Sequence, residues 1–125
     1  NDTYGHQKGD LALALCAKLL RSSLRRDIDV ACRYGGEEFV TILPATDLEG
    51  AARIAEQVRQ SCENHPFLGE EKQIKVTLSG GVAAMSSEHL INGTELLRRA
   101  DVMLYEAKRS GRNRISVWRG ESGSE

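Results

Sequence analysis

Two glycines followed by two carboxylates form the most chemically suggestive segment of this sequence, at residues 35–38. Strand-like runs at 30–34 and 39–43 flank it, so we expect it at the tip of a hairpin. Glycine has no Cβ and lets a ligand approach the backbone closely. Glu37 and Glu38 at a turn can reach one site, and such oxygen ligands suit Mg²⁺ with substrate phosphates. A solvated acidic turn is the alternative interpretation.

Two further polar segments lie at the expected ends of helices. Asn1 and Asp10 combine an amide and a carboxylate, which can read the Watson–Crick edge of guanine. The alternative for Asp10 is a helix N-cap. Lys108 and Arg112 belong to a basic turn and can hold phosphates. Favourable charge at a helix C-terminus is the alternative for that turn.

Hydrophobic periodicity and turn residues predict the elements that position these groups. Capping-box spacing at Thr46 with Glu49, and at Asn92 with Glu95, predicts two helix starts. The predicted helices are 11–24, one from the Thr46 cap to Pro66, and one from the Asn92 cap to a terminator at Gly111; the predicted strands are 30–34, 39–43, 74–78 and 115–117. This order predicts an α+β fold with helices packed on a sheet.

A glycine pair and the chain ends complete the prediction of the fold. Gly80 and Gly81 predict a bulge or a close backbone approach. We expect one domain over residues 1–119 and a frayed tail at 120–125.

The composition excludes several classes of protein. The 125 residues include 17 Lys plus Arg and 18 Asp plus Glu, a net charge of −1. A nucleic-acid-binding or membrane-surface domain would show a basic excess. No apolar run approaches the ~20 residues of a membrane helix. Cys16, Cys32 and Cys62 lack disulfide or zinc spacing, so we expect buried thiols in a reducing compartment, with a reactive thiol as the alternative.

Five segments, taken together and in this order, resemble the GGDEF domain of the diguanylate cyclase family. The signature has the form GGEEF, one of the family's active variants. The segments are NDTYGHQKGD at 1–10, RYGGEEF at 33–39, SGGV at 79–82, RADVMLYEAK at 99–108 and SGRN at 110–113. The resemblance covers nearly the whole chain.

The resemblance implies a nucleotidyl-cyclase palm with a ferredoxin-like core and a central, antiparallel-rich sheet. It also implies a homodimer that condenses two GTP molecules into cyclic di-GMP and releases two pyrophosphates, with Mg²⁺ or Mn²⁺ as cofactor. A sensor domain upstream in the parent protein would control dimerisation. The domain would be cytoplasmic and without direct membrane or nucleic-acid contact, although the parent could be anchored through another domain.

The family's site residues carry over by position. Asn1 and Asp10 would recognise guanine, and Gly35 and Gly36 would line the nucleotide site. Lys108 and Arg112 would hold the triphosphate. Glu37 would ligate metal and help to activate the 3′-hydroxyl, and Glu38 would be a second acidic contributor. These residue types suit phosphoryl transfer, which depends chiefly on positioning and charge neutralisation.

The resemblance also implies a site for product inhibition. Arg26 and Asp29 match the family's Arg-x-x-Asp motif, five residues before the signature. The arginine would stack on guanine and pair with phosphate of cyclic di-GMP, while the aspartate would take a guanine edge. A solvated loop pair is the alternative.

One family element is missing from the sequence. The family's first strand, Asp-x-Asp-x-Phe-Lys, precedes the segment that begins here with Asn1, and its first aspartate is a metal ligand. We expect the parent protein to carry this strand, and metal binding to be impaired without it. Gly80 is a smaller departure, because the family usually has an apolar residue there.

Two other functions remain as alternatives. A catalytically silent GGDEF domain would sense GTP or cyclic di-GMP, but the intact signature weighs against it. A polymerase-like palm would act on nucleic acid, but the near-neutral charge and the 5% aromatic content weigh against that.

Overall fold

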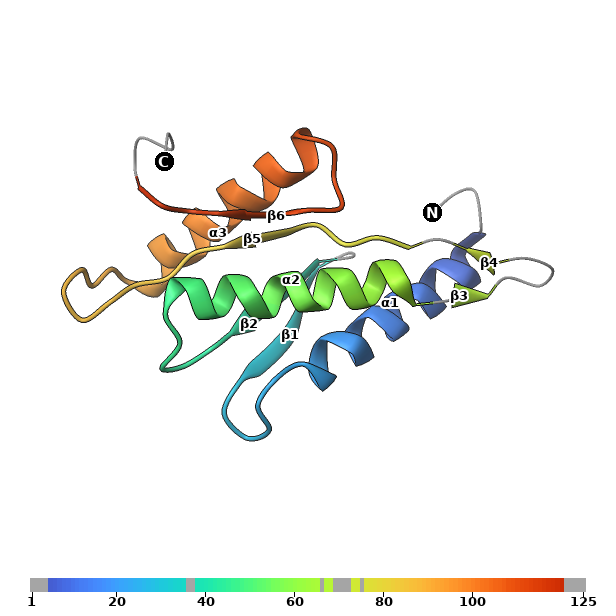
Figure 1. The fold of residues 1–125 in the computed structure, drawn as a ribbon, viewed down its shortest axis with the longest axis horizontal. Coiled ribbons are helices and arrows are strands. Elements are labelled where there is room, and N and C mark those ends of the chain that lie inside the picture. The colour runs from blue at the N-terminus through green and yellow to red at the C-terminus, as the bar shows by residue number, and fades with distance from the viewer. Residues whose placement is uncertain (1–4, 36–37, 66, 69–72, 75, 121–125) are drawn as a thin grey trace.

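The computed structural model describes residues 5–35, 38–65, 67–68, 73–74 and 76–120, in which helices alternate with short strands (Figure 1). The helices are α1 (Gly5–Ser22), α2 (Leu48–Asn64) and α3 (Gly93–Arg109). The strands are β1 (Val30–Gly35), β2 (Glu38–Ile42), β3 (Phe67–Leu68), β4 (Gln73–Ile74), β5 (Gly80–Val82) and β6 (Ile115–Val117). The predicted α+β class is confirmed.

The strands form three two-stranded sheets in the described part of the chain. β1 and β2 are the predicted antiparallel hairpin, with Val30 opposite Ile42 and Gly35 opposite Glu38. β3 and β4 are also antiparallel, whereas β5 and β6 are parallel and joined through α3. A parallel pair requires a long crossover, which the helix supplies. No ladder among the described residues joins the hairpin to β5 and β6, so the expected central sheet consists of separate pairs here.

The third predicted strand is wrong in extent. Instead of a strand over 74–78, the ladder of β4 covers only Gln73–Ile74, residues 77–79 form none, and β5 begins at Gly80. The strand begins later than predicted because its partner is β6. Gly80 is the first residue that pairs with β6, opposite Ile115.

The start of α2 corrects the predicted capping box by one residue. Asp47 is the N-cap, and its Oδ1 accepts a hydrogen bond of 2.8 Å from the Gly50 N–H. The Thr46 hydroxyl instead lies 2.9 Å from Arg25 Nη2 and donates to the Pro44 carbonyl at 3.1 Å. The Thr46 hydroxyl is therefore bonded to groups outside the helix, and Asp47 caps the helix instead.

The start of α3 confirms the prediction. Asn92 Oδ1 accepts a hydrogen bond of 2.8 Å from the Glu95 N–H. None of the helices in the described residues combines the length and apolar character needed to cross a membrane.

The core of the described region lies around α2, β5 and α3, with β5 and β6 running between the two helices (Figure 1). Gly81 confirms the expected close backbone approach, because a Cβ there would collide with backbone atoms of Ala100 and Leu104. A Cβ at Gly80 would lie 2.7 Å from Ile115 Cδ1, so the isoleucine fills the space that a larger residue would need. The buried apolar side chains are Ala51, Val58, Cys62, Val82 and Ala107.

α1 and α2 meet through two free thiols. Cys16 Sγ lies 3.3 Å from Cys62 Sγ, and Cys62 is almost fully buried. The hydrogen bond with Cys16, together with burial, raises the pKa of Cys62. Cys32 is exposed on the hairpin, so the expectation that all three thiols are buried is wrong for this residue.

Candidate functional site

The tip of the β1–β2 hairpin carries the acidic part of the predicted site. β1 ends at Gly35 and β2 begins at Glu38, while Gly36 and Glu37 lie outside the described residues. In the described ranges, no group of three or more His, Cys, Asp or Glu side chains is arranged to hold a metal ion. Glu38 lies at the tip and contributes one carboxylate. Carboxylate oxygens are ligands that Mg²⁺ prefers. The assignment of Glu37 as metal ligand therefore stays a prediction.

The last turn of α3 brings a cation to this hairpin. Lys108 Nζ lies 3.4 Å from Glu38 Oε2, although 70 residues separate the two in sequence. The side chains are 32% and 39% exposed, so a ligand can reach both. The fold thus joins two of the predicted site residues.

A tight turn carries Arg112 past the end of α3. Gly111 confirms the predicted helix end: its φ is 131°, and the next residue donates from its N–H to the Ala107 carbonyl at 2.9 Å. Arg112 itself has a φ of 63° and an exposed side chain. Lys108 and Arg112 therefore lie on either side of one ordered turn.

The predicted guanine-reading residues belong to the region of α1. Asp10 lies inside this helix, five residues after Gly5, so the alternative that it is the N-cap is wrong. The backbone N–H groups that follow a residue in the helix interior already donate to carbonyl groups of the helix, so they need no cap. The Asp10 side chain and all of Asn1 lie outside what the structure describes, and their role stays a prediction.

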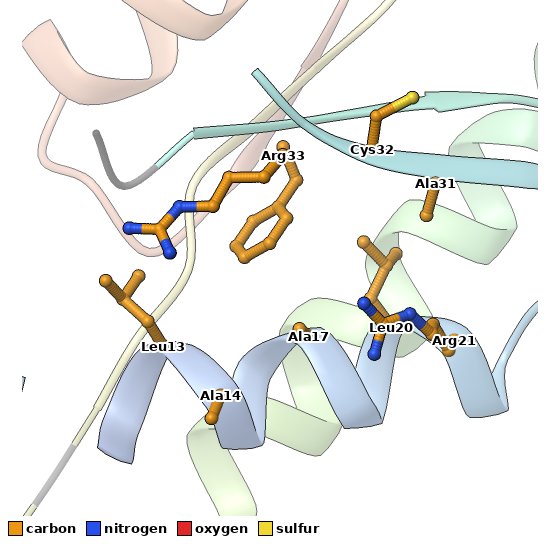
Figure 2. Close-up of a pocket in the computed structure, with 9 residues that line it drawn as sticks. Leu13, Ala14, Ala17, Leu20, Arg21, Ala31, Cys32 and Arg33 are labelled. Atoms are coloured by element: carbon orange, nitrogen blue, oxygen red, sulfur yellow. The ribbon is translucent and has the colours of Figure 1, made fainter. Parts of the chain in front are cut away.

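A cavity of about 320 Å³ lies between α1 and the hairpin (Figure 2). Two arginines and seven apolar or cysteine residues line it, and Arg33 extends from the hairpin toward Leu13 of α1. The residues that line it are Leu13, Ala14, Ala17, Leu20, Arg21, Ala31, Cys32, Arg33 and Phe39. The cavity thus separates the helix that carries Asp10 from the strand that leads to Gly35.

The loop with the predicted inhibitory residues is held by Arg25. The Asp29 carboxylate has no exposed surface and accepts hydrogen bonds from Arg25 Nη2 at 2.7 Å and from the Arg25 N–H at 2.8 Å. This guanidinium holds the pKa of Asp29 below its usual range. Arg25 Nη2 also donates to the Pro44 carbonyl at 2.6 Å. The solvated-pair alternative is therefore wrong for Asp29, whereas Arg26 is exposed.

The sequence patterns did not indicate two residues, Arg25 and Arg59, that contact the predicted segments. Arg25 stands four residues before Asp29, a spacing that signals an ion pair only where the backbone curls as it does here. Arg59 of α2 donates from Nη1 to Asn113 Oδ1 at 2.9 Å, and 54 residues separate them. No local pattern predicts such a contact.

Comparison with known sequences assigns the chain to a family. The family described as "Diguanylate cyclase, GGDEF domain" matches residues 1–114. Diguanylate cyclase A of Treponema denticola is 42% identical over 117 residues, which cover 94% of this chain and 31% of that protein. The response regulator PleD of Caulobacter vibrioides is 48% identical over 118 residues, 92% of this chain and 25% of that protein. The chain therefore spans about a quarter to a third of these curated relatives.

Solved structures share the fold. The active GGEEF domain of a diguanylate cyclase from Vibrio cholerae has a TM-score of 0.83 at 39% identity, covering 97% of this chain and 75% of that one. The GGDEF domain of DgcB from Caulobacter crescentus, solved in complex with c-di-GMP, has a TM-score of 0.84 at 32% identity, covering 94% of this chain and 68% of that one. With the family match over residues 1–114, these similarities show that the chain belongs to the diguanylate cyclase GGDEF family.

Proposed function

We propose that this chain is the catalytic domain of a diguanylate cyclase, which condenses two GTP molecules into cyclic di-GMP and releases two pyrophosphates. The observation that carries the proposal is the contact of Lys108 with Glu38, because it places a cation beside an acidic hairpin tip. Phosphoryl transfer uses this combination, with carboxylates on the metal side and cations on the phosphates. Family membership supports the same reaction.

Each predicted site residue takes one role in this proposal. The cavity between α1 and the hairpin supports a nucleotide site there, because Asp10 and Gly35 belong to the elements on its two sides. Asn1 and Asp10 read guanine, and Gly35 and Gly36 admit the nucleotide. Lys108 and Arg112 hold the triphosphate. Glu37 and Glu38 supply the carboxylates.

In each half of the reaction, the 3′-oxygen of one GTP attacks the α-phosphorus of the other. The new O–P bond forms while the bond from the α-phosphorus to the bridging oxygen of the β-phosphate breaks, and pyrophosphate leaves. The 3′-hydroxyl gives up its proton to water, and Glu37 helps to activate this hydroxyl from the acidic side of the site. Lys108 and Arg112 offset the charge of the departing pyrophosphate. A bound Mg²⁺ or Mn²⁺ would supply further neutralisation of the phosphates.

The reaction implies partners. One domain holds one GTP, so two domains must face each other, and we propose a homodimer for activity. An upstream sensor domain would control that encounter in the whole protein, which we place in the cytoplasm because GTP is found there. Cyclic di-GMP would also bind at Arg26 and Asp29 and inhibit the enzyme.

The test is to incubate the whole protein that contains this chain with GTP and Mg²⁺ and to separate the products by anion-exchange chromatography. We expect cyclic di-GMP and pyrophosphate in a ratio of one to two. Glu37→Gln should lower the rate by about 100-fold or more, whereas Glu106→Gln, which removes a partly exposed carboxylate bound to Arg109, should not. Bound GTP without any product would overturn the enzyme proposal and favour the silent sensor.

A further inference from the structure

The turn that carries Arg112 is fastened to α2 and to the segment before β5 by its last residue, Asn113. Asn113 Oδ1 accepts a hydrogen bond of 2.9 Å from Arg59 Nη1, and Asn113 Nδ2 donates to Glu63 Oε2 at 2.9 Å. The Asn113 N–H donates to Ser79 Oγ at 3.0 Å. Three hydrogen bonds thus link one residue to two other parts of the chain.

The α2 side of this attachment is an ion network around one largely buried guanidinium. Arg59 has a side chain that is only 14% exposed, and it lies 2.6 Å from Glu56 Oε2 and 3.0 Å from Glu63 Oε1. Its hydrogen bond to Glu56, followed by that to Glu63, raises the pKa of this guanidinium. Glu63 therefore serves both Arg59 and Asn113, while Glu56 does not bond to the turn.

The backbone of the turn needs outside support. Gly111, Arg112 and Asn113 have φ values of 131°, 63° and 50° in succession. Glycine takes such angles freely and asparagine tolerates them, but arginine there is strained. Residues in such conformations persist when surrounding contacts determine them. Asn113 follows Arg112 directly, and its hydrogen bonds hold the backbone of Arg112 in this conformation.

We propose that Asn113, held by Arg59 and Glu63, is a positioning residue that fixes the Arg112 guanidinium for binding the triphosphate of GTP. The inference rests on the proposed function, since it assumes that Arg112 binds phosphate. Asn113 itself does not touch the substrate. It restricts where the turn can place its neighbour, so its loss weakens phosphate binding only through Arg112.

The experiment is a double-mutant cycle in the whole protein, read by isothermal titration calorimetry with inorganic triphosphate. Asn113→Gly keeps the left-handed backbone accessible and removes both side-chain bonds to α2. Arg112→Ala should weaken binding about 10-fold or more, as expected for a lost charge-assisted bond to phosphate. Asn113→Gly should weaken it about three- to tenfold, and the double variant should bind no more weakly than Arg112→Ala.

Two carboxylate variants provide the matched control. Glu63→Gln and Glu56→Gln each remove one charge beside Arg59, but only Glu63 also bonds to Asn113. Glu63→Gln should raise the KM for GTP with little change in kcat, and Glu56→Gln should leave both within about twofold.

The outcomes separate the two proposals. If Asn113→Gly weakens triphosphate binding equally with and without Arg112, the residue does not act through Arg112 and the inference is overturned. Equal effects of Glu63→Gln and Glu56→Gln overturn it as well. If Arg112→Ala leaves triphosphate binding unchanged, the phosphate role in the proposed function fails first, and the positioning role fails with it.

Discussion

Lys108 Nζ of α3 lies 3.4 Å from Glu38 Oε2 of β2, so the basic end of a helix meets the acidic start of a strand. Both side chains are partly exposed, and such surface pairs contribute only about 0–1 kcal/mol to stability. The pair therefore holds the fold weakly, and a triphosphate can compete for the lysine at little cost.

Lys108→Met should separate function from stability. We expect the KM for GTP to rise about 10-fold or more, because a charge-assisted contact with phosphate is lost. The free energy of unfolding should change by less than about 1 kcal/mol. Steady-state kinetics of the whole protein and urea unfolding measure the two effects.

The control for this substitution is Arg109→Gln, one residue further along the same turn. Arg109 pairs with Glu106, and its side chain is 64% exposed. A comparable loss of GTP affinity in that variant would mean that general charge at the helix end, and not Lys108 in particular, attracts the nucleotide.

Gly81→Ala should destabilise the protein strongly. The added methyl group would meet backbone atoms of Ala100, Met103 and Leu104, which cannot rotate away as a side chain can. Overpacking of this kind costs about 1–3 kcal/mol. Gly93→Ala is the matched control, because nothing lies within 4 Å of a Cβ there. Its stability should stay equal or rise by up to about 1 kcal/mol. Urea midpoints compare the two, and equal midpoints would refute the close contact.

The first turn of α3 should make stability depend on pH. Hydrogen bonds from Arg98 and Arg99 lower the pKa of Glu95 from 4.5 to about 2. The folded state therefore favours the ionised carboxylate, so its contribution is complete above pH 4.5 and is lost as the pH falls toward 2. Glu95→Gln should flatten the pH dependence of the thermal midpoint in this window. An unchanged slope in the variant would assign the acid sensitivity to other carboxylates.

Arg26→Ala should relieve product inhibition. Arg26 is exposed, whereas Asp29 is paired with Arg25, so cyclic di-GMP would have to replace that contact to reach the aspartate. We expect unchanged initial rates and a progress curve that no longer slows as cyclic di-GMP accumulates. Continued slowing at the same product concentration would show that cyclic di-GMP does not inhibit the enzyme through Arg26.

Local sequence patterns predicted the elements whose signals are local. The hairpin followed from two apolar runs around Gly35-Gly36, and α3 followed from the Asn92 cap and the Gly111 end. Asn92 and Gly111 act through contacts within a few residues, so the chain itself displays what stabilises them.

Long-range contacts explain the features that the sequence could not reveal. Thr46 and Asp47 are both good caps, and the choice between them depends on Arg25, which is 21 residues away from Thr46. The position of β5 depends on pairing with Ile115. In the site, motif order predicted residues such as Lys108, but its partner Glu38 lies 70 residues away and only the fold identifies it.

In the part of the chain that the structure describes, the acidic and basic halves of the candidate site lie on elements that share no sheet. The hairpin carries Glu38, whereas Lys108 and Arg112 belong to the continuous unit β5–α3–β6, and no backbone ladder in the described residues joins the two. A rigid-body displacement of one unit by a few ångströms would separate the charges without breaking a hydrogen bond within either sheet. Such an inactive form would have the same secondary structure as the active one, so circular dichroism would not distinguish them. A signal that moved one unit against the other would therefore change the site by geometry alone, while each unit kept its fold.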